Sequence, residues 1–270
     1  MTKFEVLVFM AEGTKEVVVR EDAPNWFVAL ESALSGLGLA DCMANILCDV
    51  KEDGAIHVSD TMSSRRFLVR EIDPSKEGGI TPPVSSQSVG REVKVVKKEE
   101  LLADLFTDVM DAWDLSEKEA TEFFLDLALK YIPSESGSIA KTDLSSNDLE
   151  FIACRGPKSN EVCGLKIKMG QGLSGFSAKH SCYIAVSDVQ KDPRFFREIS
   201  DKLGYETNSI ACAPVKSSET SITFGVIQLI NKTNSYQFNE DDMEYLRFIS
   251  EKMAEYFNMM WLSTDNNLED

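Results

Sequence analysis

The residues best suited to chemistry in this sequence lie in its C-terminal half. Residues 170–175 read Gly-Gln-Gly-Leu-Ser-Gly and lead into a helix that we expect over 173–179. Glycine lets the chain reverse tightly because it tolerates backbone angles that a side chain penalises, and the N–H groups at a helix N-terminus favour anionic ligands. The same glycines also suit a purely structural turn, so both roles stay open.

A second chemical group follows shortly after this turn. Residues 187–189 read Ser-Asp-Val, and residues 192–196 read Asp-Pro-Arg-Phe-Phe. Irregular loops of this kind contact ligands because they can close over a pocket. The Asp188 carboxylate can accept hydrogen bonds from a base or an amine, or it can cap the segment 189–196. Both roles stay open.

Small and polar residues interrupt two apolar strands expected further along the chain. The strand over 209–215 carries Ala211 and Ala213, whose small side chains leave space beside a cavity. The strand over 225–230 carries Gln228, a polar side chain that needs a partner in apolar surroundings. These strands predict a cavity with a polar group on its wall.

Catalytic and metal-binding groups are sparse. Only two histidines are present, His57 and His180, so a histidine-centred triad or a metal cluster is hard to assemble. The six cysteines contain no Cys-x-x-Cys pair and show neither zinc-ligand spacing nor a dense disulfide pattern. We expect reduced, buried thiols, no catalytic residue, no metal and no cofactor.

The charge of the chain limits its partners. The 45 acidic and 28 basic residues give a net charge of −17, which repels phosphate backbones and anionic lipids. The sequence begins without a signal-peptide pattern, and its apolar runs are shorter than a membrane span. These features predict a cytoplasmic protein that binds neither nucleic acid nor membrane.

The elements that must position these residues fall into two groups. Residues 1–72 predict a small, separate α+β domain of unknown role with the order ββαβββ. After its second strand, Asp22 is expected to cap a helix whose apolar positions run from Trp26 to Leu37. The order matches no family that we recognise, and it carries no chemistry that we can assign.

The second group follows a change in composition. Residues 73–98 lack apolar periodicity and are rich in Gly and Pro, which indicates a flexible linker. Residues 99–262 predict an α+β fold, with an antiparallel sheet flanked by helices. Ser116 begins a capping-box signature in this region, and the last helix is expected over 239–262. Residues 263–270 form an acidic tail.

The order of helices, hairpin, glycine turn, aspartate loop, strands and closing helix across 99–262 resembles the GAF domain family. Four residues match the NKFDE motif of phosphodiesterase and adenylyl cyclase GAF domains: Asn231, Lys232, Phe238 and Asp242. Met243 stands in place of the final Glu of that motif. The match implies a structural brace in which Lys232 pairs with Asp242 and ties a strand end to the last helix.

The resemblance also implies a ligand pocket. In GAF domains that bind cyclic nucleotides, the region around Gln228 faces the base, which makes Gln228 the leading polar candidate. The expected ligand-binding residues are Gly172, Ser174, Phe176, Asp188, Val189, Phe195, Phe196, Cys212 and Gln228.

GAF domains are usually small-molecule sensors and not enzymes. The leading hypothesis is therefore a non-enzymatic sensory or regulatory protein that binds a small molecule, with a cyclic nucleotide as one candidate, and signals through protein contacts. One alternative is an interaction or dimerisation module with a filled pocket. Another is a thiol-dependent methionine sulfoxide reductase. Wide apolar helix faces over 99–115 and 239–262 predict a homodimer.

Overall fold

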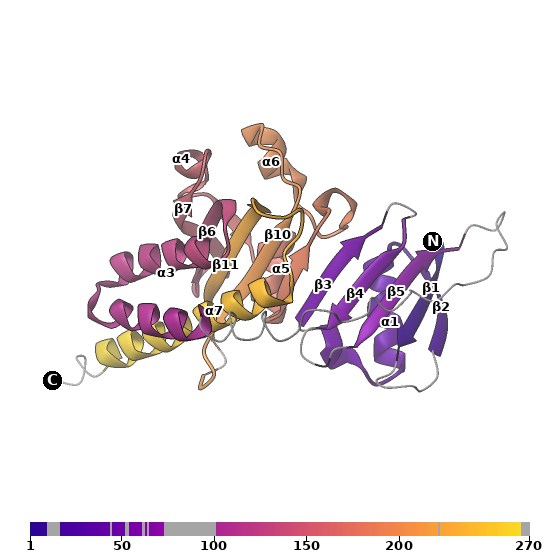
Figure 1. The fold of residues 1–270 in the computed structure, drawn as a ribbon, viewed down its shortest axis with the longest axis horizontal. Coiled ribbons are helices and arrows are strands. Elements are labelled where there is room, and N and C mark those ends of the chain that lie inside the picture. Colours follow the sequence, from indigo (N-terminus) through magenta and orange to yellow (C-terminus); the bar gives the residue numbers. More distant parts are fainter. Residues whose placement is uncertain are drawn as a thin grey trace.

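The structure, a computed structural model, describes residues 1–9, 17–43, 45–51, 54–60, 63, 65–72, 101–220 and 222–265. We call residues 1–72 the N-terminal unit and residues 101–265 the C-terminal unit. Strands of both units join in one 11-stranded sheet with the order β2-β1-β5-β4-β3-β9-β10-β11-β6-β7-β8. Figure 1 shows the two units side by side, with β3 at their junction.

The N-terminal unit contributes five strands and one helix of three turns. Its elements are β1 (Thr2–Phe9), β2 (Val17–Ala23), α1 (Trp26–Gly36), the 3-10 helix η1 (Ala40–Met43), β3 (Asn45–Val50), β4 (Ile56–Asp60) and β5 (Arg66–Glu71). The predicted order ββαβββ is confirmed. The predicted cap is wrong, because Asp22 lies in β2 opposite Lys3. Asn25 caps α1 instead, and its side chain accepts a 3.0 Å hydrogen bond from the Val28 N–H.

The C-terminal unit holds the remaining elements, and its residues 101–109 are helical. The helices are η2 (Met110–Asp114), α3 (Glu117–Tyr131), α4 (Ser159–Val162), α5 (Gly172–His180), η3 (Val189–Lys191), α6 (Arg197–Leu203) and α7 (Glu240–Asp265). The strands are β6 (Ser134–Asp143), β7 (Asp148–Arg155), β8 (Lys166–Lys168), β9 (Tyr183–Val186), β10 (Ile210–Lys216) and β11 (Thr223–Lys232). Every strand pair within this unit is antiparallel.

The helix ends follow the sequence signals in part. Ser116 and Glu119 form the predicted capping box at the start of α3, which satisfies N–H groups that lack partners within the helix. α7 continues to Asp265, so the first residues of the predicted tail are helical. Residues 266–270 and the predicted linker 73–98 lie outside the described residues. Within the described part of the chain, no helix is long and apolar enough to cross a membrane.

One parallel strand pair joins the two units. β3 pairs with β9, which places Cys48 opposite Val186, and the Ser187 N–H donates to the Cys48 carbonyl at 3.2 Å. A single cluster of buried apolar side chains runs from Phe27 in the N-terminal unit to Ile184 in the C-terminal unit. The N-terminal unit thus shares both sheet and core with its neighbour, and its separate folding stays a prediction.

The sheet of the C-terminal unit is covered differently on its two faces. One face packs against α3, α7 and residues 101–114 through fully buried side chains such as Phe124 and Tyr256. The other face carries α5 and α6. Successive strand side chains point to opposite faces, so Leu229 packs toward α3 and α7 whereas Gln228 points toward α5.

Candidate functional site

A cavity of about 100 Å³ lies on the sheet face that carries α5 and α6. Strands β6, β7, β8, β10 and β11 supply one side of it, and α4, α5, α6 and the residues just before α6 supply the other. Its apolar lining includes Phe151, Ile167, Leu173, Ile199, Leu203 and Ile230. An apolar cavity with a few polar groups is the usual form of a small-molecule site.

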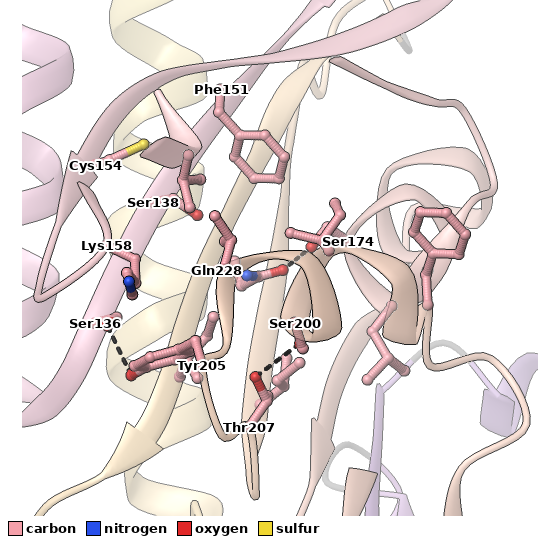
Figure 2. A pocket seen from close by; sticks show the side chains of 18 of the residues that line it. Ser136, Ser138, Phe151, Cys154, Lys158, Ser174, Ser200, Tyr205, Thr207 and Gln228 are labelled. Carbon is pink, nitrogen blue, oxygen red and sulfur yellow. Dashed lines mark hydrogen bonds between the residues drawn. The ribbon is translucent and has the colours of Figure 1, made fainter. Parts of the chain in front are cut away.

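Gln228 supplies an amide to the wall of this cavity. The Ser174 hydroxyl, in the first turn of α5, donates a hydrogen bond to the Gln228 side-chain oxygen (Figure 2). The Cys212 sulfur lies 3.9 Å from the same hydroxyl and is fully buried. The strand glutamine therefore has the partner that its apolar surroundings require. Its amide nitrogen points away from Ser174 (Figure 2).

The turn before α5 requires glycine because of its backbone conformation and because of close packing. Gly170 and Gly172 have φ values of +92° and +69°, which favour glycine over residues with a side chain. A Cβ atom on Gly172 would lie 3.2 Å from the Phe196 Cβ, so the chain before α6 approaches this glycine closely. The turn thus has a structural role, and it also brings Phe196 to the cavity.

Several hydroxyl groups also line the cavity (Figure 2). The sequence did not predict them. The Tyr205 hydroxyl lies 2.8 Å from the Ser136 hydroxyl, and the Ser200 and Thr207 hydroxyls lie 3.1 Å apart. Burial raises the pKa of Tyr205. Ser138 lines the cavity two residues after Ser136 on β6, so strand alternation could have found both. Tyr205 and Thr207 lie in an irregular segment that offers no such signal.

Two basic side chains at the cavity have different partners. Arg155 binds Asp126 through two hydrogen bonds of 2.7 and 3.0 Å. Lys158 Nζ lies 3.6 Å from the Glu161 carboxylate in a partly exposed pair. Exposed ion pairs are weak, so Lys158 is the cation that can more readily turn to an anionic group in the cavity.

The predicted ligand-binding residues divide into two sets. Those that line the cavity are Gly172, Ser174, Phe195, Phe196 and Gln228, with Cys212 directly behind Ser174. Three others lie away from the cavity lining: Phe176, Asp188 and Val189.

Each of these three has another structural role. The Asp188 side chain accepts a 3.2 Å hydrogen bond from the Gln190 N–H and caps η3, which is the alternative that its sequence context allowed. Val189 is fully buried. Phe176 stacks on His180, with ring centroids 4.2 Å apart. Burial lowers the pKa of that histidine, which is consistent with a packed ring.

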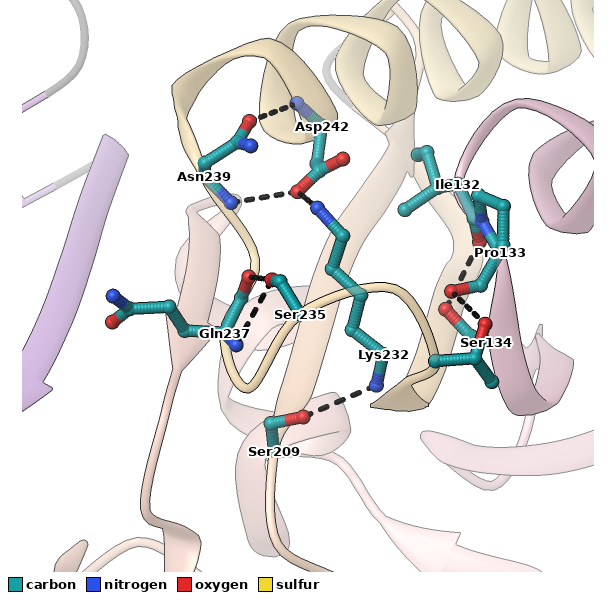
Figure 3. Close-up of polar contacts among 10 residues, drawn as sticks. Ile132, Pro133, Ser134, Ser209, Lys232, Ser235, Gln237, Asn239 and Asp242 are labelled. Carbon is teal, nitrogen blue, oxygen red and sulfur yellow. Dashed lines mark hydrogen bonds and ion pairs between the residues drawn. The ribbon is translucent and has the colours of Figure 1, made fainter.

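The predicted pair of Lys232 and Asp242 is present (Figure 3). The two side chains are only 4% and 9% exposed and form an ion pair. The Asp242 carboxylate also accepts a 2.7 Å hydrogen bond from the Asn239 N–H, and the Asn239 side chain accepts one of 3.0 Å from the Asp242 N–H. The pair therefore fixes the end of β11 to the start of α7. Met243, which replaces the motif's Glu, is buried in the same core cluster as Phe238.

Asn231 joins three segments near the cavity. Its φ of +55° is a left-handed conformation that asparagine tolerates better than most residues. Its side-chain oxygen accepts a 2.8 Å hydrogen bond from the Asn208 N–H. Its side-chain nitrogen donates to the Glu135 carboxylate at 2.9 Å and to the Glu206 carbonyl at 2.8 Å. Asn231 thus holds the irregular segment that carries Tyr205 against the sheet.

The cysteines offer little nucleophilic character. Burial raises the pKa of Cys48, Cys154, Cys182 and Cys212 to about 12. Since the thiolate is the reactive form, these groups are poor nucleophiles near neutral pH. Cys163 is the exposed cysteine. Among the residues that the structure describes, no group of three or more His, Cys, Asp or Glu side chains could hold a metal ion.

Known proteins resemble this chain in part. No family model matches it. The cGMP-specific 3',5'-cyclic phosphodiesterase of Drosophila melanogaster is 43% identical over 82 residues, which are 30% of this chain and 7% of that protein. The dual 3',5'-cyclic-AMP and -GMP phosphodiesterase 11A of Takifugu rubripes is 37% identical over 84 residues, which are 31% of this chain and 9% of that protein. The chain thus spans a small part of either relative.

Solved structures share the fold at low sequence identity. The GAF domain of a phosphoenolpyruvate-protein phosphotransferase from Coxiella burnetii matches with a TM-score of 0.54 and 16% identity, over 63% of this chain and 98% of that one. Residues 101–262 have the GAF fold. A free methionine-R-sulfoxide reductase from Neisseria meningitidis also matches, with a TM-score of 0.50 and 17% identity, over 64% of this chain and 95% of that one. The GAF fold is thus shared by proteins with different functions.

Proposed function

We propose that this chain is a cytoplasmic sensory or regulatory protein whose GAF domain binds a small molecule and signals through protein contacts. The observation that carries the proposal is the Gln228–Ser174 pair on the wall of a mostly apolar cavity. Ser174 engages the amide oxygen, so the Gln228 nitrogen can donate to a ligand. A few polar groups of this kind orient a ligand that is otherwise held by apolar contacts.

A cyclic nucleotide is the first candidate ligand. Its base presents acceptors for the Gln228 nitrogen, and its phosphate carries a negative charge. Lys158 lies at the cavity, and the first N–H groups of α5 lie beside Ser174, where an anion is favoured. The phosphodiesterases named above that share part of this sequence act on cyclic nucleotides, which supports the candidate.

The cavity must open to admit such a ligand. Small-molecule sites have volumes of about 300–1,000 Å³, whereas this cavity measures about 100 Å³. Phe195 and Phe196 form part of its wall, directly before α6. α4 and α6 both contain no buried residue, but α4 packs against β7 whereas α6 makes few contacts with any other element, so α6 is the covering element with the weakest anchorage. Binding therefore moves α6 and the residues before it outward.

Calorimetric titration and thermal denaturation with cGMP and cAMP test the proposal. A ligand at 100 times its Kd stabilises the folded state by about 2.7 kcal/mol, so the melting temperature should rise. Gln228→Met keeps the side-chain length and removes the amide, and it should weaken binding by about ten-fold. Gln237→Met, at an exposed turn, is the matched control and should bind as the unmodified protein does.

Two results would contradict the proposal at different levels. If neither nucleotide binds at millimolar concentration but another metabolite raises the melting temperature, the nucleotide candidate is wrong and the sensor role stands. If no member of a broad metabolite panel binds, the GAF domain is not a small-molecule sensor. The same panel separates the sensor from the interaction module, because a filled cavity is indifferent to every ligand.

The small cavity favours one alternative function, an interaction or dimerisation module. Phe106, Met110 and Met259, on residues 101–114 and α7, are 54%, 47% and 43% exposed. Exposed large apolar side chains can mark protein interfaces, and we propose that residues 101–114 and α7 pair two copies of the chain. Light scattering at micromolar concentration should give twice the chain mass of 30.1 kDa. A monomeric mass would contradict the homodimer.

A further inference from the structure

The residues between η3 and α6 face two parts of the molecule at once. Arg194 extends toward the N-terminal unit, where it meets aromatic rings of α1. The next two residues, Phe195 and Phe196, line the cavity of the GAF domain. Neighbouring residues on one short segment thus contact the candidate ligand site and the N-terminal unit.

Arg194 is held in one geometry by Asp192. The Asp192 carboxylate accepts hydrogen bonds from the Arg194 backbone N–H at 2.9 Å, from Nε at 2.9 Å and from Nη2 at 2.6 Å. The Arg194 side chain is 7% exposed and the Asp192 side chain is 1% exposed. Within the described part of the chain, the buried Arg194 Nη1 has no hydrogen-bond partner. The guanidinium is therefore fixed on one side by the carboxylate, and the buried Cys48 thiol lies close enough to interact with it.

Aromatic rings from both units surround this guanidinium. Its central carbon lies 4.3 Å from the ring centroid of Phe27, 5.1 Å from that of Phe176 and 5.8 Å from that of Trp26. A guanidinium over ring faces is attracted by them, most strongly when water is excluded. The Trp26 indole N–H also donates to the Lys191 carbonyl at 3.4 Å. Trp26 and Phe27 form the first turn of α1.

On the opposite side, the same segment closes the cavity. The Phe195 N–H donates to the Asp192 carbonyl at 3.1 Å, which makes a turn of the residues between them. Phe196 packs against Gly172, where no side chain separates it from the start of α5. A ligand larger than the present cavity must displace these two rings, and the turn joins them directly to the residues that hold Arg194.

We infer that the segment 192–196 transmits occupancy of the cavity to the N-terminal unit, with Arg194 as the contact that α1 receives. The inference rests on the proposed function, because it requires a cavity that opens. It assigns a role to residues 1–72: they are the receiving unit for the sensor. Outward movement of Phe195 and Phe196 shifts Arg194 within its aromatic surroundings and loosens α1.

Hydrogen–deuterium exchange on the full chain tests the inference with and without a ligand. The first perturbation is cGMP. The second is Ser138→Leu, which places apolar atoms in the cavity and needs no ligand. We expect either one to change the amide exchange rates of both α6 and α1 by about three-fold or more. An unchanged α1 in Ser138→Leu overturns the inference, whatever α6 does.

The two perturbations also separate this inference from the proposed function. If cGMP has no effect while Ser138→Leu changes exchange in α1, the transmission stands and the nucleotide proposal fails. If cGMP changes exchange in α6 and leaves α1 unchanged, the sensor stands and the transmission fails.

Two variants test whether the change passes from the cavity to α1 through Arg194. Asp192→Asn with Arg194→Met removes both buried charges together, so that neither is left unpaired. In this background, Ser138→Leu should still change α6 and should no longer change α1. Phe27→Leu removes one ring from the N-terminal side, keeps the ion pair, and should also reduce the response of α1.

Phe67→Leu is the matched control, since Phe67 is buried in the same unit but is not one of the rings around Arg194. An equal reduction in Phe67→Leu contradicts the path.

Discussion

The two faces of the GAF sheet are built from the same strands but serve different purposes. On one face, α3 and α7 cover the sheet with large side chains that are fully buried, such as Phe124, Leu246 and Tyr256. On the other face, the short helices α4, α5 and α6 leave a cavity. The long helices α3 and α7 bury a large apolar area against the first face. The opposite face has a buried cluster of its own but also keeps open space and polar groups.

The largest effect is expected at the buried ion pair that ties β11 to the packed face. Asp242→Ala leaves Lys232 buried without its partner, and such a change costs about 3–5 kcal/mol. Urea denaturation followed by circular dichroism should show this fall in the unfolding free energy. Lys232→Met with Asp242→Leu removes both charges and should recover most of it. A loss below about 1 kcal/mol in Asp242→Ala, within the range of an exposed pair, contradicts the described burial.

Substitutions at two neighbouring residues of β11 allow the packing of the two faces to be compared directly. Leu229→Ala creates a hole on the packed face and should lower the unfolding free energy by about 2–5 kcal/mol. Gln228→Met, one residue earlier, replaces a side chain at the cavity with one of similar length, and it should cost less than about 1.5 kcal/mol. The same denaturation experiment measures both. Equal losses would show that the faces do not differ in packing.

The smallest effect on the unfolding free energy is expected from the buried thiols, and it appears only at alkaline pH. These thiols all belong to the apolar cluster on the cavity side. Burial raises the pKa of Cys48, Cys182 and Cys212 from 9.0 to about 12. Because the folded pKa lies above the unfolded one, these thiols contribute stability that is complete below pH 9 and is lost as the pH rises through about 12.

Denaturation at several alkaline pH values checks this prediction. The unfolding free energy should fall between pH 9 and pH 12, and Cys212→Ala should show a smaller fall. At neutral pH, a maleimide should label Cys163 rapidly and the buried cysteines only after unfolding. Rapid labelling of Cys212 in the folded protein contradicts the burial and would support the reductase alternative.

Local signals in the sequence predicted much of the fold. The capping box at Ser116 and the helix start at Asn239 depend on residues three positions apart, so the sequence shows them directly. The cap of α1 was mispredicted because β2 extends further than its apolar residues suggest. The partner of Gln228 is Ser174, and period-two alternation alone does not identify a contact 54 residues away.

Contacts between distant segments were the main omission. Arg194 was read only as part of a pocket loop, yet its ring contacts lie on α1 and α5. No periodicity in residues 1–72 indicates which later segment they meet. Such contacts depend on the packing of whole elements, which a local pattern does not encode.

The pairing of β3 with β9 has a consequence for how the protein is made. Residues that meet across this junction, such as Asp49 and Ser187, are 138 positions apart. During synthesis at about 5–20 residues per second, β3 leaves the ribosome many seconds before its partner. Throughout that interval its outer edge has free N–H and C=O groups, which invite pairing with other chains. The junction between the two units is thus also an edge of the nascent protein that needs protection.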